Sequence, residues 1–246
     1  MPSDPSGGIG RLNETALHAA LKQWVARPGD EFEAWVDGYL IDVVRGDLLI
    51  EIQTSGFAKL KRKLLDLAER RPVRLVHPIA REKWIVRQRA DGTTARRKSP
   101  KRGRIELLFA ELASIPRLLH EPNVSIEVVL TQEEDVRRHD APRRGWRRRG
   151  WGTVERRLLA VVEHRLFARP ADLGALLPRE VAEPFTTAEL AEALGLRRRL
   201  AQQMAYCLRE LGVVAATGKR GNAVLYERQA PRGVAIIGSQ PLRRRR

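Results

Sequence analysis

Two turn sequences, Asp37-Gly38 and Gly46-Asp47, constrain the first half of the chain more than any other feature. They separate three segments rich in β-branched and aromatic residues, near 31–36, 39–45 and 48–53. Glycine adopts positive φ at little steric cost, so a glycine–aspartate pair favours a two-residue turn between antiparallel strands. We therefore expect a meander of three strands.

The second turn also sets a register. If Gly46 and Asp47 are its central residues, Arg45 faces Leu48 and, further along the same strands, Asp42 faces Glu51. Two opposed carboxylates destabilise an exposed strand pair by about 0.2 to 1 kcal/mol. A divalent cation offsets this repulsion, because Mg²⁺ takes oxygen ligands and commonly uses one or two carboxylates. The sequence predicts a Mg²⁺ or Mn²⁺ site at this pair.

Apolar residues at helical spacing predict helices on both sides of the meander. One should be capped by Asn13 and run to about Ala26, and another should span Phe57 to Arg70 before a strand at Val73 to Val76. Beyond this core we expect a strand at 83–89, a turn at Asp91-Gly92, a helix at 105–113, a strand at 124–130 and solvated arginine-rich loops at 95–104 and 137–149.

Three more polar residues belong to the expected carboxylate site. Gln53 lies two residues after Glu51, on the same face of the strand. Glu14 falls beside the apolar stripe of the first helix, where a carboxylate needs a partner, and His18 follows it by one turn. We expect His18 to hydrogen-bond Glu14 rather than to bind phosphate or transfer a proton.

The order helix, three-stranded meander, helix and strand, with Asp42 followed by Glu51-Ile52-Gln53, resembles the PD-(D/E)XK nuclease superfamily. The resemblance covers roughly residues 12–80. It implies that Asp42 and Glu51 bind the metal ion and that Glu14 adds a further ligand.

Two residues depart from the pattern of that superfamily. Ile41 stands where a proline is usual, and Gln53 replaces the lysine that steadies the attacking water and phosphate charge. Some members with glutamine here still cut DNA, whereas others only bind it, so both outcomes stay open. A lysine of the following helix, Lys63 in preference to Lys61, is expected to supply the missing charge.

The last third of the chain resembles a winged helix-turn-helix domain over about residues 153–228. A helix at 154–167, a capped helix at 187–194, a turn at Gly195 and a helix at 198–211 precede a β-hairpin near 213–226. The resemblance implies that DNA is contacted from the start of the second of the paired helices and from the hairpin tip, by Arg197, Arg198, Arg199, Gln202, Gln203, Lys219 and Arg220.

The charge balance points to a polyanionic partner. Lysine and arginine number 46 against 30 acidic residues, a formal charge of +16, which favours nucleic acid. No apolar run is long enough to span a bilayer, and the N-terminus lacks a secretory pattern, so we expect a cytoplasmic protein, associated with the nucleoid if bacterial. The single cysteine, Cys207, excludes disulfides and fits a buried thiol.

Together these features predict an α/β chain with two domains. We expect a flexible leader (1–11), a PD-(D/E)XK-like domain (12–135), an arginine-rich linker (136–152), a winged helix-turn-helix domain (153–228) and a basic tail (229–246). The expected function is a Mg²⁺- or Mn²⁺-dependent DNA endonuclease; the alternative is an inactive, nuclease-like DNA-binding regulator or scaffold. RNA as the partner, a homodimer, and base stacking by Trp146 and Trp151 stay open.

Overall fold

The structure is a computed structural model that describes residues 15–139 and 150–229. Its first strands form the expected meander: β1 (Glu31–Val36), β2 (Tyr39–Arg45) and β3 (Leu48–Ile52). Asp37 and Gly38 both have positive φ, whereas at the second turn Gly46 does and Asp47 does not. Arg45 pairs with Leu48, as predicted. Turn chemistry therefore fixed both the strand bounds and the register.

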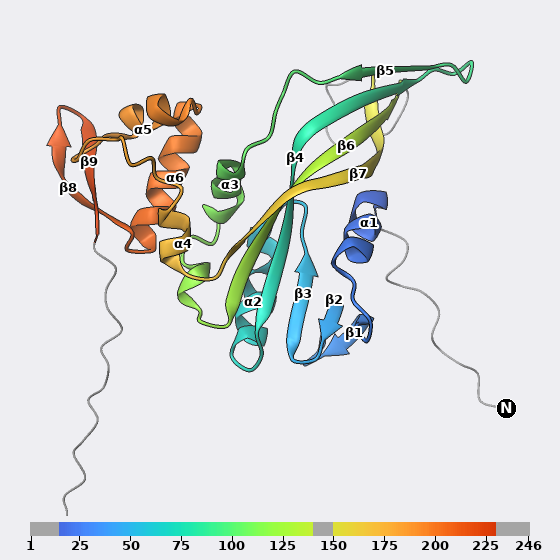
Figure 1. Cartoon of the computed structure of the whole chain (residues 1–246), viewed down its shortest axis with the longest axis horizontal. Helices are drawn as coiled ribbons and strands as arrows, with labels where there is room; N and C mark the ends of the chain where they lie inside the picture. The colour runs from blue at the N-terminus through green and yellow to red at the C-terminus, as the bar shows by residue number, and fades with distance from the viewer. Residues whose placement is uncertain (1–14, 140–149, 230–246) are drawn as a thin grey trace, which may run out of the picture.

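The meander is one edge of a seven-stranded mixed sheet (Figure 1). Its strands run in the order β1-β2-β3-β4-β6-β7, and β5 pairs with the far end of β4. The new strands are β4 (Val73–Gln88), β5 (Thr94–Lys98), β6 (Val124–Arg138) and β7 (Gly152–Phe167). The β3–β4 and β4–β6 pairs are parallel and the rest are antiparallel, so the chain is an α/β protein.

Several expectations for this region are wrong. Segments 73–76 and 83–89 belong to one long strand with an irregularity between Ala80 and Glu82. Part of the expected loop at 95–104 forms β5. The expected helix at 154–167 is strand β7, which pairs with β6 over nearly its whole length. The sheet therefore continues to Phe167, past the domain boundary that we placed near residue 140. Residues 140–149, with Trp146, lie outside the described residues.

Bulges explain why β7 resembles a helix in sequence. Its pairing with β6 shifts at three points, and each shift leaves one extra residue in β7: Val154, Leu159 and Val162. All three side chains are exposed. An extra residue breaks the two-residue alternation of a strand. The apolar residues consequently recur at spacings of three and four, which is the period of a helix.

Helices cover both faces of the sheet. Helix α1 (Ala16–Val25) is capped by Thr15 rather than by Asn13, which lies outside the described residues, and it packs Leu17 and Leu21 on one face. The other face carries α2 (Lys61–Ala68) and α3 (Leu108–Leu112), each preceded by a short 3₁₀ turn, at Phe57–Leu60 and Ile105–Leu107. Another 3₁₀ turn (Leu118–His120) leads into β6.

The C-terminal elements follow their expected bounds closely. After α4 (Pro170–Gly174) come α5 (Thr187–Leu194), α6 (Arg198–Glu210) and the hairpin β8 (Val214–Arg220) with β9 (Ala223–Arg228). Thr186 and Glu189 cap α5 reciprocally, and Gly195 ends it in the left-handed conformation.

One hydrophobic core joins these C-terminal helices to the sheet. Phe109 and Leu112 of α3 belong to the same buried cluster as Met204, Cys207 and Leu208 of α6. The buried Cys207 thiol points to the Phe109 carbonyl, and burial raises the pKa of that thiol to about 12. We had expected each half to bury a core of its own.

Candidate functional site

The expected carboxylate pair lies where β2 and β3 separate. Their ladder ends at Val43 and Ile50, and Asp42 and Glu51 are the next residues in the same register. Oδ2 of Asp42 accepts a 2.7 Å hydrogen bond from the Ile52 amide. The carboxylate of Asp42 therefore occupies the point of separation and bonds to the neighbouring strand.

Helix α1 brings His18 to Asp42. Nε2 of His18 lies 3.2 Å from Oδ2 of Asp42, whereas the Glu14 that we expected as its partner is outside the described residues. Burial alone would raise the pKa of Asp42. The hydrogen bond and charge of His18, the Ile52 amide and the Lys63 charge outweigh burial and lower that pKa. Asp42 is thus held as an anion.

Helix α2 brings Lys63 to Glu51 from the other face of the sheet. Its Nζ lies 2.7 Å from Oε2 of Glu51 and donates to the Leu40 carbonyl at 2.6 Å. Both side chains are largely buried, 15% and 11% exposed. Burial and the charge of Asp42 raise the pKa of Glu51 to about 7, against the opposing effect of Lys63. Asp42, Glu51 and Lys63 therefore form one cluster of interacting charged side chains.

Gln53 makes different contacts from those expected. It follows the last residue of β3, and its side-chain amide donates to the Ser55 carbonyl at 2.5 Å. In the described part of the chain no hydrogen bond joins it to Asp42, Glu51 or Lys63. The backbone carbonyl oxygen of Gln53 lies 2.8 Å from Nδ1 of His77.

His77 is a residue that the sequence reasoning missed. It is buried in β4, its ring packs edge-on against Phe57, and burial lowers its pKa. The available signal was a titratable residue inside an apolar run. Arg45, three residues after Asp42, binds Asp30 at 2.7 Å.

The basic residues expected to contact DNA lie on α6 and the β8–β9 hairpin. Arg198, Arg199 and Gln202 are exposed on α6, and Gln203 is half-buried. Lys219 and Arg220 are exposed near the hairpin tip, where Nη1 of Arg220 is 2.7 Å from Oε1 of Glu189. The described residues thus place six of these side chains over two adjoining elements, with Arg197 just before α6.

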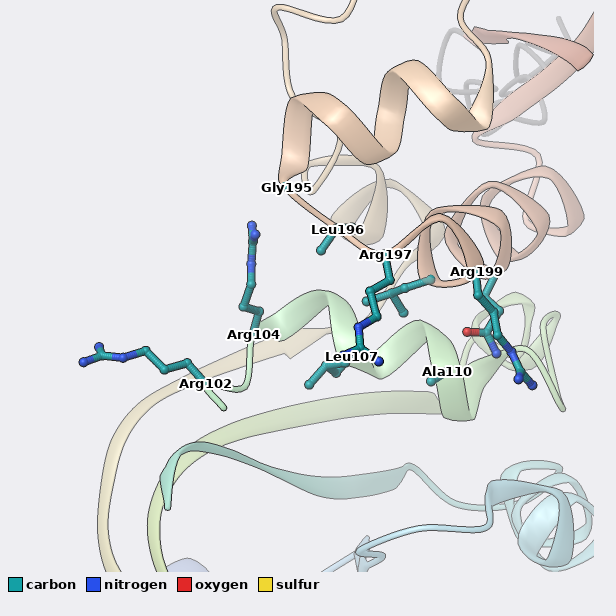
Figure 2. Close-up of a pocket in the computed structure, with 10 residues that line it drawn as sticks. Arg102, Arg104, Leu107, Ala110, Gly195, Leu196, Arg197 and Arg199 are labelled. Atoms are coloured by element: carbon teal, nitrogen blue, oxygen red, sulfur yellow. The ribbon is translucent and has the colours of Figure 1, made fainter. Parts of the chain in front are cut away.

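Arg197 and Arg199 also line a cavity of about 290 Å³ between α3 and the start of α6 (Figure 2). Arg102 and Arg104, from the segment that follows β5, line it as well. We expected these two arginines only in a solvated loop. Their meeting with α6 depends on tertiary packing and has no local sequence signal.

Fold and sites together define a mixed α/β protein with a buried acid–lysine group between β2 and β3 and a basic helical surface elsewhere. The chain belongs to the family described as a domain of unknown function, DUF8091, which matches residues 15–168. An uncharacterized protein of Treponema pallidum (strain Nichols) is 31% identical over 226 residues, covering 91% of this chain and 88% of that protein. No solved structure matches. No helix within the described ranges has the length and apolarity to cross a membrane.

Proposed function

We propose that the chain is a DNA-binding endonuclease that hydrolyses phosphodiester bonds with Mg²⁺ or Mn²⁺. The observation that carries the proposal is the position of Lys63, whose Nζ lies 2.7 Å from Glu51 beside Asp42. In PD-(D/E)XK enzymes, which the sequence order resembles, a lysine usually supplies a positive charge at this place, and Gln53 carries none. A lysine arriving from α2 restores the charge from another element.

The donor set fits a hard divalent cation. The charge of Asp42 raises the pKa of Glu51 in a largely buried place, so a cation there relieves a repulsion that the fold retains. Within the described residues, Oδ1 of Asp42 and Oε1 of Glu51 have no hydrogen-bond partner. No group of three or more histidine, cysteine or acidic residues suited to a metal occurs in that same part of the chain. Mg²⁺ commonly completes such a two-carboxylate site with water and substrate phosphate.

The protein's own residues then have separate tasks. Asp42, fixed by His18 and the Ile52 amide, and Glu51 would hold the cation. The chemistry that a divalent ion would supply there is a nucleophile from water at neutral pH and charge stabilisation at the phosphate. Lys63 adds positive charge where the phosphodiester becomes more negative, and it does so from a largely water-excluded position. Glu14, outside the described residues, is the proposed further ligand.

The C-terminal elements are proposed to dock DNA in the manner of a winged helix-turn-helix domain. The order α5, turn, α6 and hairpin supports this, as do the arginines at the start of α6 and the basic hairpin tip. Contacts of this kind are made mainly to DNA phosphates, so the affinity for DNA should fall steeply as the salt concentration rises.

Cleavage of supercoiled and linear DNA with Mg²⁺ or Mn²⁺ tests the proposal. Native protein should nick or cut, and Asp42→Asn and Glu51→Gln should lose cleavage while retaining DNA binding. Asp47→Asn is the matched control, because Asp47 is an exposed carboxylate in the turn of the same hairpin. Metal-dependent cleavage that survives in both Asp42 and Glu51 variants would assign the activity elsewhere.

A second candidate is an inactive nuclease-like DNA-binding regulator or scaffold. The observation in its favour is that Lys63 already forms an ion pair with Glu51 inside the chain. This candidate expects salt-sensitive DNA binding with no cleavage in either metal, and no effect of Asp42→Asn on that binding.

A further inference from the structure

The cavity between α3 and α6 joins parts of the chain that are far apart in sequence. Arg102 and Arg104 reach it from the segment after β5, and Arg197 and Arg199 reach it from the start of α6. Its floor is apolar, formed by Leu107 and Ala110 on one side and by Leu196 and Leu200 on the other. Figure 2 shows Arg197 and Arg199 extending toward α3.

The segment that carries Arg102 and Arg104 is held firmly in place. Between them, the Gly103 amide donates to the Ala80 carbonyl at 3.0 Å. A Cβ at Gly103 would lie 2.3 Å from that carbonyl oxygen, so only glycine permits this approach. Arg104 is further held by the Leu194 carbonyl at the end of α5 and by Glu106, 3.0 Å away. The cavity wall is therefore preorganised.

The charges around the cavity do not balance. Arg104 is paired with Glu106, and Arg102 lies 3.5 Å from Glu82. Within the described ranges, no acidic residue forms an ion pair with Arg197 or Arg199. Two arginine charges thus remain over an apolar floor. A phosphate monoester, which carries about −1.5 to −2 at neutral pH, matches this charge, and arginine binds phosphate oxygens in a bidentate manner.

We propose that this cavity binds one nucleotide, with its phosphate on Arg197 and Arg199 and its base and sugar against the leucine floor. A volume of about 290 Å³ lies at the lower end of ligand pockets, which start at about 300 Å³, so one nucleotide unit is the appropriate size. The unit comes either as a free nucleotide or as the 5′-phosphorylated end of a single DNA strand. This site shares no residue with the Asp42 and Glu51 group and does not depend on cleavage.

Calorimetric titration of the full chain in EDTA tests this site without metal. The probes are deoxyadenosine monophosphate, deoxyadenosine and inorganic phosphate. The nucleotide should bind at least about tenfold more tightly than either fragment, since each supplies only half of the contacts. Arg197→Ala and Arg199→Ala should each weaken nucleotide binding about tenfold or more. Arg209→Ala, at the other end of α6 and away from the cavity, should change it less than about twofold.

A ten-nucleotide deoxyadenosine strand with and without a 5′-phosphate separates the two sources. If the free nucleotide fails to bind but the phosphorylated strand binds more tightly than the unphosphorylated one, and Arg197→Ala removes the difference, the ligand is a strand end. Equal losses in Arg197→Ala and Arg209→Ala would overturn the proposal, because they indicate diffuse attraction. Equal binding of phosphate and nucleotide would also overturn it. Neither result bears on cleavage by the Asp42 and Glu51 group.

Discussion

Replacing Glu51 with glutamine should stabilise the protein at alkaline pH. In the folded chain, burial and Asp42 raise the pKa of Glu51 from 4.5 to about 7. The folded state therefore binds this proton more tightly than the unfolded state does. Stability from this group is greatest below pH 4.5 and is lost as the pH rises through 7. The difference between the two pKa values corresponds to about 3 kcal/mol.

Glutamine has nearly the shape of protonated glutamic acid and no charge at any pH. Glu51→Gln should thus be more stable than the native chain by up to about 3 kcal/mol at pH 8 and nearly equal to it at pH 5. Lys63 does not alter this comparison, because its effect is already contained in the pKa of Glu51. If Glu51 holds a metal ion, as proposed, the same substitution that raises stability should also weaken metal binding.

Urea unfolding in EDTA at pH 5 and pH 8, followed by circular dichroism, measures the effect. Glu31→Gln is a matched control, because Glu31 is exposed in β1 of the same sheet. It should leave the pH dependence of the native chain in place. A Glu51→Gln chain less stable than native at pH 8, or one with the native pH dependence, would refute the reasoning.

Three further predictions concern the metal site, the buried cluster of α3 and α6, and the cap of α5. Mg²⁺ at about a hundred times its dissociation constant should stabilise the native chain by about 2.7 kcal/mol at pH 8, and thermal melts should show no such gain in Asp42→Asn. Phe109→Ala should cost about 3–5 kcal/mol and shift one common transition in calorimetry, whereas two separated transitions would contradict the shared core. Thr186→Ala should cost about 1 kcal/mol through loss of the α5 cap, measured by urea unfolding; Thr217→Ala, on exposed β8, should be neutral.

Local chemistry made much of the fold predictable from the sequence. The meander followed from Asp37-Gly38 and Gly46-Asp47, and α5 followed from its threonine cap and Gly195. In each case the residues that set the backbone lie within a few positions of the element. The pairing of Val43 with Ile50 followed for the same reason, and it leaves Asp42 and Glu51 as the next residues of the two strands.

Long-range pairing was not predictable in the same way. Strand β7 carried a helix-like spacing because bulges added residues at three points, and only its pairing with β6 shows them. His18 contacts Asp42, 24 residues further on, and helical spacing gives no signal of that contact; its expected partner Glu14 lies outside the described residues. Helical angle placed Lys61 and Lys63 alike beside the apolar face of their helix, and the contact of Lys63 with Glu51 depended on where α2 crosses the sheet.

The buried cluster shared by α3 and α6 limits which parts of the chain can fold alone. The DUF8091 match ends at residue 168, but Phe109 and Leu112 within it pack against Met204 and Leu208 beyond it. A protein made of the matched region alone would have an exposed hydrophobic patch where α6 packs in the whole chain. Such a patch would make it prone to aggregation and proteolysis. Either region alone would therefore expose apolar residues that the whole chain buries. The Treponema pallidum relative, aligned over 91% of this chain, has kept both regions together.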